Sequence, residues 1–340
     1  MLLSIVLITQ LVVSVITAIY FGSAIKKQRT KKTSAQKDSA YELDRIKKQE
    51  AIKLTCPLTE LSRPKTLDEI VGQKEGIINL KAVLCGDNPQ HVIIYGPPGV
   101  GKTAAARAVL ECAKKNQDSP FEENAKFIEV DATTVQYDER SIADPLIGSV
   151  HDPIYQGAGA YGPAGVPQPK PGAVTKANGG VLFIDEIGEL PTVQLNRLLK
   201  VLEDRRVFFE SSYYASDDPN IPKHIHYAFK NGLPADFRLI GATTRSPEEI
   251  NPAIRSRCVE IFFDNLSKPE LVEIGRRAVS RSGITINESQ LSYAAEFAQN
   301  GRDMVNIVQM ASSVTKSCGR QFVQKKDIQW VADSCRYSKL

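Results

Sequence analysis

A glycine-rich stretch between a short apolar run and a helix-like run constrains this chain most. Residues 91–95 (HVIIY) have the length and composition of a buried strand, and residues 104–115 (AAARAVLECAKK) are typical of a helix. The intervening sequence fits G-x-x-x-x-G-K-[ST] in the strand–loop–helix context that this motif needs. The alternative is a glycine-rich turn that matches by chance. The pattern predicts a phosphate-binding loop of Gly96, Pro97, Pro98, Gly99, Val100, Gly101, Lys102 and Thr103.

The chemistry of such a loop follows from its residues. Glycines let backbone N–H groups close around phosphate oxygens, and the helix N-terminus adds the positive end of its dipole. Lys102 can reach the β- and γ-phosphates, and the Thr103 hydroxyl can bind Mg²⁺. The sequence therefore predicts ATP and Mg²⁺ as ligands.

Two further strands carry polar residues at their ends. The apolar run 181–184 (VLFI) leads into Asp185 and Glu186, where Asp185 would hold Mg²⁺ and Glu186 would activate the attacking water as general base. A surface Asp-Glu pair is the alternative. The run 237–240 leads to Thr244, whose hydroxyl could touch the γ-phosphate or that water. Such carboxyl-terminal strand ends share one edge of a parallel sheet.

From residue 266 the pattern becomes helical. Segments 267–283, 287–301, 302–319 and 325–335 have apolar residues spaced by three and four. Ser267 and Asn287 are expected as N-caps, and Gly283, Gly301 and Gly319 as helix ends. We predict an α/β domain with a parallel sheet over 60–265, followed by a small all-helical domain over 266–340.

The N-terminus predicts a membrane anchor. Residues 2–25 hold no charged side chain, and as a helix they would reach ~36 Å, enough for a ~30 Å hydrocarbon core. Five positive charges follow in residues 26–32, which places the rest of the chain in the cytoplasm. A cleaved signal and a buried core helix are the alternatives. We expect an anchor over 1–25 and a basic juxtamembrane linker over 26–59. Residues 33–55 of this linker are expected to form a solvated tether or a short helical stalk, and a helix that pairs with copies of itself is the alternative.

The charge distribution and the cysteine content argue against two classes of function, nucleic-acid binding and zinc binding. Residues 26–53 carry a net charge of +6, which leaves −2 on the remainder, so the body lacks the basic excess of a nucleic-acid binder. The six cysteines include no C-x-x-C pair, which argues against zinc and for reduced thiols in a cytosolic compartment.

Together these residues resemble the AAA+ ATPases over about 60–336. The resemblance rests on the order of Arg63-Pro64, residues 70–73 (IVGQ), the phosphate loop, Asp185-Glu186, Thr244, Arg257 and Arg302. It implies that Val71 lies against the adenine and Thr244 stands at the sensor-1 position. It also implies that Arg257 is an arginine finger reaching the neighbouring subunit's nucleotide, with Arg255 as runner-up. Arg302 matches the sensor-2 arginine of the helical lid.

Within that family the chain is most similar to the ATPase part of membrane-anchored Lon-B-type proteases, through residues 144–162, 171–190 and 232–258. This similarity implies a homo-oligomeric, hexameric ring that threads unfolded protein. Tyr161-Gly162, with Tyr155 second, is the candidate pore loop, and a packed surface loop is the alternative.

Lon-type proteases continue into a Ser–Lys peptidase domain, whereas Ser338 and Lys339 are adjacent in a short tail. We therefore expect ATPase activity at the cell membrane without peptide-bond cleavage by this chain alone. A truncated protease, a member without proteolysis and a partner of a separate peptidase all fit. A nucleic-acid motor (branch-migration or clamp-loader-like) and a nucleotide-switched scaffold are the alternative functions.

Overall fold

The computed structural model describes Thr17, Phe21 and residues 42–52, 54–135, 144–151, 166–219 and 221–339. The chain divides into two compact units, Met1–Cys56 and Pro57–Leu340. In the first unit, residues 42–51 form a helix with exposed side chains and the ion pairs Arg45–Glu42 and Lys48–Asp44. None of the helices in the described ranges is both long and apolar enough for a membrane span. The predicted anchor over 1–25 lies outside the described residues, apart from Thr17 and Phe21.

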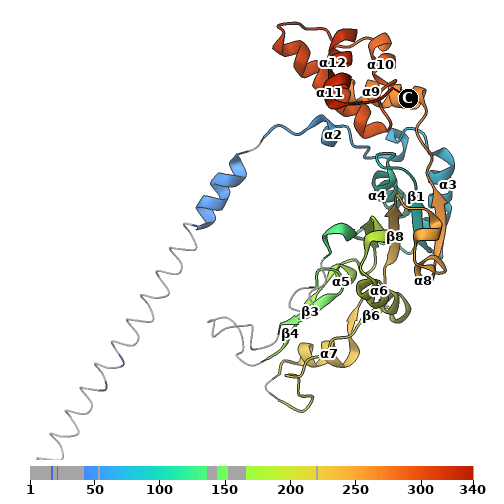
Figure 1. Cartoon of the computed structure of the whole chain (residues 1–340). Coiled ribbons are helices and arrows are strands. Elements are labelled where there is room, and N and C mark those ends of the chain that lie inside the picture. Colours follow the sequence, from blue (N-terminus) through green and yellow to red (C-terminus); the bar gives the residue numbers. More distant parts are fainter. Residues whose placement is uncertain are drawn as a thin grey trace, which may run out of the picture. The chain divides into compact units, whose positions relative to one another are not determined.

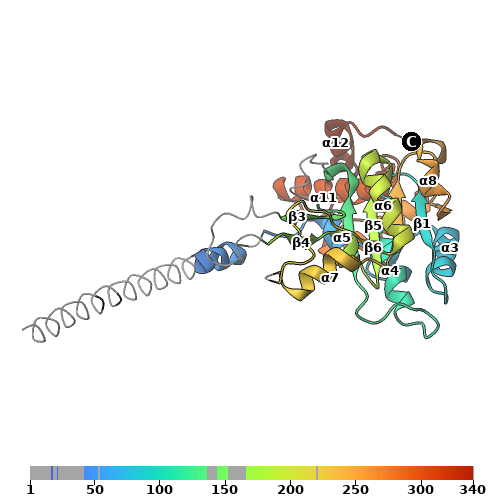
Figure 2. The ribbon, with the colours of Figure 1, turned by 90° about the horizontal axis from the view of Figure 1, so that it is seen from below.

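The second unit contains the predicted parallel sheet (Figures 1 and 2). Its order is β2-β5-β8-β1-β9, and every neighbouring pair is parallel. The strands are β1 (His91–Tyr95), β2 (Phe127–Asp131), β5 (Val181–Asp185), β8 (Arg238–Thr243) and β9 (Cys258–Phe262). The three apolar runs singled out in the sequence are the three central strands, which are buried on both faces and thus lack polar alternation.

Alternate strand residues face two separate helical layers. Phe183 and Ile94 pack with α3 (Lys74–Leu84) and α4 (Lys102–Ala113) on one face. Leu182 and Ile93 pack with helices on the other face. Those helices are α5 (Ala173–Lys176), α6 (Thr192–Asp204) and α8 (Pro252–Arg255). The sheet thus lies between two helix layers, as expected for an α/β fold.

Two small antiparallel strand pairs form separate sheets. One joins β3 (Gly148–His151) and β4 (Gln168–Pro171), and the other joins β6 (Arg206–Val207) and β7 (Leu233–Pro234). Helix α7 (Lys223–Asn231) lies between β6 and β7 in the chain and contacts β4. Shorter elements are α2 (Leu58–Leu61), η1 (Leu67–Glu69), η2 (Ala132–Thr134), η4 (Ile187–Glu189) and η5 (Pro247–Glu249).

The C-terminal region predicted to be helical contains four helices among the described residues, which we call the lid (Figure 1). They are α9 (Lys268–Ser282), α10 (Glu288–Ala294), α11 (Gly301–Ser317) and α12 (Lys325–Cys335). Ser267 caps α9 through a capping box with Glu270, and Gly283 ends α9 in the left-handed conformation.

Two sequence-based boundaries in the lid were wrong. Helix α10 ends at Ala294, well before residue 301, because the backbone turns at residues 295–297. Gly301 begins α11 instead of ending a helix, since the Asn300 side chain accepts the Asp303 N–H as its N-cap.

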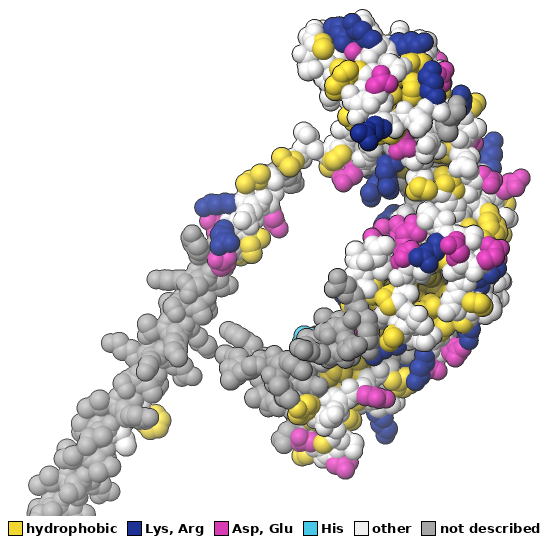
Figure 3. Space-filling view, in the orientation of Figure 1, with side chains coloured by type: hydrophobic (Ala, Val, Ile, Leu, Met, Phe, Trp, Pro, Cys, Tyr) yellow, Lys and Arg dark blue, Asp and Glu magenta, His cyan; other side chains and the backbone are white. Residues whose placement is uncertain are grey.

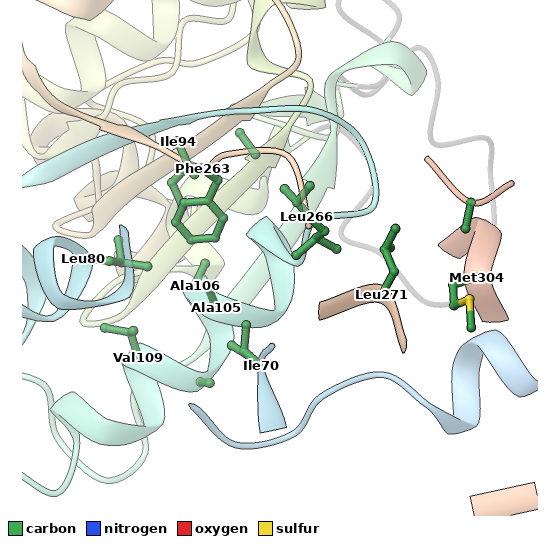
Figure 4. Close-up of a cluster of buried hydrophobic side chains, with 14 of the residues drawn as sticks. Ile70, Leu80, Ile94, Ala105, Ala106, Val109, Phe263, Leu266, Leu271 and Met304 are labelled. Carbon is green, nitrogen blue, oxygen red and sulfur yellow. The ribbon is translucent and has the colours of Figure 1, made fainter. Parts of the chain in front are cut away.

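One continuous hydrophobic cluster joins the lid to the sheet (Figure 4). Ile94 of β1 and Val109 of α4 lie at one end, and Leu271 and Met304 of the lid lie at the other. Ile70, Phe263 and Leu266 connect them. The lid therefore shares one hydrophobic core with the helix that follows the glycine-rich loop.

Candidate nucleotide site

Three glycines of the loop, Gly96, Gly99 and Gly101, have positive φ angles, and at the first two a side chain would also collide with neighbouring atoms. Gly96 has φ of +152°, and a Cβ there would lie 2.5 Å from the carbonyl oxygen of Phe263. Gly99 has φ of +72°, and its Cβ would lie 2.7 Å from the Asn300 Oδ1. A side chain at either position would push β9 or the lid away from the loop.

Lys102 lies inside this loop. Its side chain is buried, and its ammonium donates hydrogen bonds of 2.6 Å to the Gly96 carbonyl and 3.0 Å to the Pro97 carbonyl. Burial lowers the pKa of Lys102, while Glu186 and Asp185 act in the opposite direction. The ammonium and both carboxylates therefore share one electrostatic site, as the sequence predicts.

Asp185 ends β5, and Glu186 follows it with a left-handed backbone (φ +48°). Burial raises the pKa of Asp185, and the Glu186 N–H offsets this by donating to its Oδ1 at 3.2 Å. A half-buried carboxylate favours a neighbouring cation. The Asp185 carboxylate and the half-buried Thr103 hydroxyl offer the oxygen ligands that Mg²⁺ prefers, so this donor set fits the ion.

Thr244 contacts Glu186 directly. Its backbone N–H and its hydroxyl both donate to Glu186 Oε2 at 3.2 Å. These residues are 58 positions apart, so no local pattern reveals the contact. Two donors on one carboxylate oxygen fix the direction of the Glu186 side chain at the carboxyl edge of the sheet.

Arg257 and Arg255 lie at the opposite edge, just before β9. Because β9 runs parallel to β1, and β1 leads into the phosphate loop, about 15 Å of strand separates Arg257 from that loop. Arg257 donates to the Ala253 carbonyl (2.8 Å) and forms an ion pair with Glu203. Arg255 pairs instead with Glu260 at 2.8 Å.

The Arg255 pair is part of a larger network. Glu260 also accepts a hydrogen bond of 3.0 Å from the Tyr95 hydroxyl, and burial together with Glu260 raises the pKa of Tyr95. Arg255 thus ties α8 to β9 and β1. Arg257 borders a cavity of about 230 Å³ at the amino ends of the strands, together with His91 and Arg238.

The lid reaches the phosphate loop through the start of α11. A Cβ on Gly301 would lie 3.2 Å from the Gly99 carbonyl, so Asn300 and Gly301 pack against the loop. Arg302, exposed in the first turn of α11, follows at once. The sequence missed Asn300, whose only signal was an N-capping residue type before a helical run.

The Val71 segment lies at the junction of the α/β domain and the lid. A Cβ on Gly72 would meet Glu270 Oε1 at 2.8 Å. Gln73 exchanges two hydrogen bonds with the backbone of Asp264, at 2.6 and 3.0 Å. Half-buried Val71 thus stands beside the lid.

The predicted pore-loop residues Tyr155, Tyr161 and Gly162 lie outside the described residues. The strands on either side, β3 and β4, pair as an antiparallel hairpin. Buried Asp144 anchors the start of this hairpin to α6 through Gln194 and Arg197, each at 3.1 Å. The sequence did not reveal this anchor, because an isolated Asp carries no pattern.

Comparisons with known proteins agree with this site. Residues 66–221 match the family described as magnesium chelatase, subunit ChlI. Lon protease 2 from Bacillus subtilis is 57% identical over 330 residues, which cover 97% of this chain and 60% of that protein. The chain thus spans about three fifths of that relative's length.

More distant proteins share the fold. The replication factor C small subunit of Methanococcus vannielii is 26% identical over 79% of this chain and 69% of its own length. A solved structure of Thermotoga maritima RuvB has a TM-score of 0.54 at 20% identity and covers 81% of this chain and 73% of its own. With the phosphate loop, Asp185, Glu186 and the lid in place, the chain belongs to the AAA+ family of P-loop ATPases and is similar over nearly its whole length to Lon protease 2.

Proposed function

We propose that residues 57–340 are the ATP-hydrolysing motor module of a Lon-B-like protease and that they unfold or thread protein substrates. The convergence of Lys102, Asp185, Glu186 and Thr244 at one edge of the sheet carries the proposal. The identity of 57% to Lon protease 2 supports this choice among AAA+ motors.

Each residue of the site has its own role in the proposed ATP hydrolysis. The Lys102 ammonium binds the β- and γ-phosphates, and the loop N–H groups orient them. Thr103 and Asp185 hold Mg²⁺, which neutralises phosphate charge when bound. Glu186, fixed by Thr244, takes a proton from the attacking water. Arg302 approaches from the lid, whose α11 packs on the loop.

Arg257 acts on a neighbouring subunit. It cannot reach the phosphate loop of its own subunit across the length of a strand. A ring of identical subunits brings the amino edge of one subunit to the nucleotide of the next, and we propose a hexamer. Each site is then completed by a residue from the adjacent copy.

The motor acts on unfolded polypeptide and is held at a membrane. Tyr161 and Gly162, between β3 and β4, grip the substrate in this proposal, with Tyr155 as the second candidate. Residues 2–25 anchor the chain as a single span, with the ATPase body in the cytoplasm. Carbonate extraction of membranes tests the anchor: the full chain should stay in the pellet, and a chain lacking residues 2–25 should not.

The alternative is a nucleic-acid motor, which we consider because the chain shares its fold with RuvB. The net charge of −2 outside residues 26–53 argues against it. In Figure 3, basic and acidic side chains are interspersed on the visible face and do not gather in one basic patch. A nucleotide-switched scaffold would need neither Glu186 nor Arg257.

One experiment separates these functions. The full chain in detergent is assayed for ATP hydrolysis alone, with an unfolded protein such as casein, and with duplex DNA. The proposal expects stimulation by the unfolded protein only. Stimulation by DNA that declines with salt would favour the nucleic-acid motor, and nucleotide binding without turnover would favour the scaffold.

A further inference from the structure

Two of the six cysteines lie side by side. Cys85 caps the C-terminus of α3, and Cys112 lies in the last turn of α4, against which α3 packs. The Cys85 sulfur lies 3.8 Å from the carbonyl oxygen of Val109, one turn before Cys112. The Asn116 side chain, about one turn after Cys112, donates a hydrogen bond of 2.6 Å to the Cys85 carbonyl. Cys112 therefore lies between two residues that contact Cys85, and both cysteines are partly exposed.

We propose that Cys85 and Cys112 form a two-thiol site that closes reversibly to a disulfide on reaction with a hydroperoxide. This proposal does not rest on the motor function. The other cysteines provide the contrast: Cys335, for example, has the thioether of Met310 at 3.8 Å, and a thioether cannot form a disulfide.

The surroundings assign an order to the reaction. Burial, reinforced by Cys112, raises the pKa of Cys85 to about 11, so Cys85 stays protonated at neutral pH. The Cys85 S–H also donates to the Val109 carbonyl, so we assign the first attack to Cys112. After loss of its proton, the Cys112 sulfur attacks the outer oxygen of the hydroperoxide, the O–O bond breaks, and an alcohol leaves after taking up a proton, which gives a sulfenic acid.

The second step closes the bond. The Cys85 sulfur attacks the Cys112 sulfur, the S–O bond breaks, and the departing hydroxide takes the Cys85 proton and leaves as water. The two thiols have then lost two electrons, and the hydroperoxide has been reduced to alcohol and water. Exchange with a small thiol reverses the reaction.

The position of the pair gives the disulfide a consequence. Helix α4 begins at Lys102 and α3 begins just after Gln73, so both start beside the nucleotide site and end at the two cysteines about 16–18 Å away. A disulfide would close a loop that contains β1 and the whole phosphate loop. By restricting the unfolded chain, it should raise the apparent Tm by about 5–10 °C.

The test treats the full chain with tert-butyl hydroperoxide, blocks the remaining thiols with an alkylating reagent, and maps the peptides by mass spectrometry. We expect one intramolecular link between the peptides of Cys85 and Cys112, reversed by dithiothreitol, together with the rise in Tm. Cys112→Ser should lose both, whereas the matched Cys335→Ser variant should keep both. The proposal is overturned if Cys85 and Cys112 are still alkylated after hydroperoxide treatment, or if each is oxidised separately to a sulfinic acid.

A second probe needs no oxidant and uses the unmodified sequence, so it does not depend on a variant that folds. Phenylarsine oxide bridges two adjacent thiols with loss of one water. One bound arsenical, with protection of Cys85 and Cys112 from alkylation, is the expected result. Continued alkylation of both cysteines in its presence would show that the thiols are not adjacent and would overturn the proposal.

Discussion

The two edges of the parallel sheet differ in whether their predicted site residues contact one another within one subunit. At the carboxyl edge, Lys102, Asp185, Glu186 and Thr244 act on one another. At the amino edge, Arg257 contacts only structural partners, Glu203 and the Ala253 carbonyl, among the interactions of the described residues. If the proposed role of Arg257 is right, one subunit can hold ATP but needs a second copy to hydrolyse it efficiently.

The largest effect is expected at the amino edge. Arg257→Ala should reduce ATP hydrolysis by about 10³–10⁵, since an arginine finger acts on charge that develops in the transition state. Nucleotide binding should persist, because the carboxyl edge is intact. Single-turnover hydrolysis and binding of a fluorescent nucleotide measure the two properties.

A mixing experiment provides the control for Arg257. Rings that combine Arg257→Ala with Glu186→Gln subunits contain some sites with an intact Glu186 and an intact neighbouring Arg257. These mixtures should hydrolyse ATP faster than either parent. Mixed rings no faster than their parents would exclude a role in trans.

At the carboxyl edge, Glu186→Gln should slow hydrolysis by about 10²–10⁴ through loss of the general base. Its amide can still accept from Thr244 and fills the same volume, so ATP should bind and remain trapped. Retention of ATP on a desalting column measures this. The matched control is Glu111→Gln, which alters an exposed glutamate paired with Lys114 and should hydrolyse normally.

Lys102→Ala tests binding at the same edge. Loss of a charge-assisted contact to phosphate should weaken ATP affinity by about 10- to 100-fold. Isothermal titration with a non-hydrolysable analogue measures it. Unchanged affinity would remove Lys102 from the site, and Lys115→Ala serves as the exposed control on the chain segment after α4.

Much of the carboxyl edge was predictable, because its chemistry is encoded locally. Buried strands show as short apolar runs, and the phosphate loop is one continuous motif, so β1, β5, β8, Lys102 and Asp185 followed from the sequence. The bond between Thr244 and Glu186 and the packing of Asn300 on Gly99 join distant segments. Such contacts depend on strand order and lid docking, which no local pattern specifies.

The amino edge was less predictable for the same reason. Arg255 and Arg257 are two positions apart, and only the family resemblance favoured Arg257 as the finger, with Arg255 as runner-up. Their partners separate them: Glu260 and Tyr95 hold Arg255 within a network that links α8, β9 and β1. Arg257 pairs with one carboxylate, that of exposed Glu203. Arg257 can therefore leave its partner more easily than Arg255 and is the better candidate to reach a neighbouring nucleotide.

A smaller effect is expected from pH. Burial raises the pKa of Asp185, so this carboxyl takes up a proton at higher pH than an ordinary aspartate. Its ionised form costs folding stability at neutral pH, and that cost disappears as pH falls. Mg²⁺ binding needs the ionised form, so the apparent affinity for Mg-ATP should fall several-fold on acidification. Titration at successive pH values measures it, and Asp185→Asn should abolish this dependence.

The smallest effect comes from the ion pair that occupies Arg257. Glu203 and Arg257 are both exposed, and such pairs contribute little to stability. A phosphate on the neighbouring subunit must nevertheless compete with Glu203 for the guanidinium. Glu203→Gln should therefore raise the hydrolysis rate of assembled rings by up to about fivefold, with unchanged Tm.

Glu260→Gln is the matched control: it removes the partner of Arg255 and Tyr95, so Tm should fall while the rate per folded ring stays the same. A slower Glu203→Gln enzyme would instead mean that Glu203 orients the finger, and a slower Glu260→Gln enzyme with normal Tm would shift the trans role to Arg255.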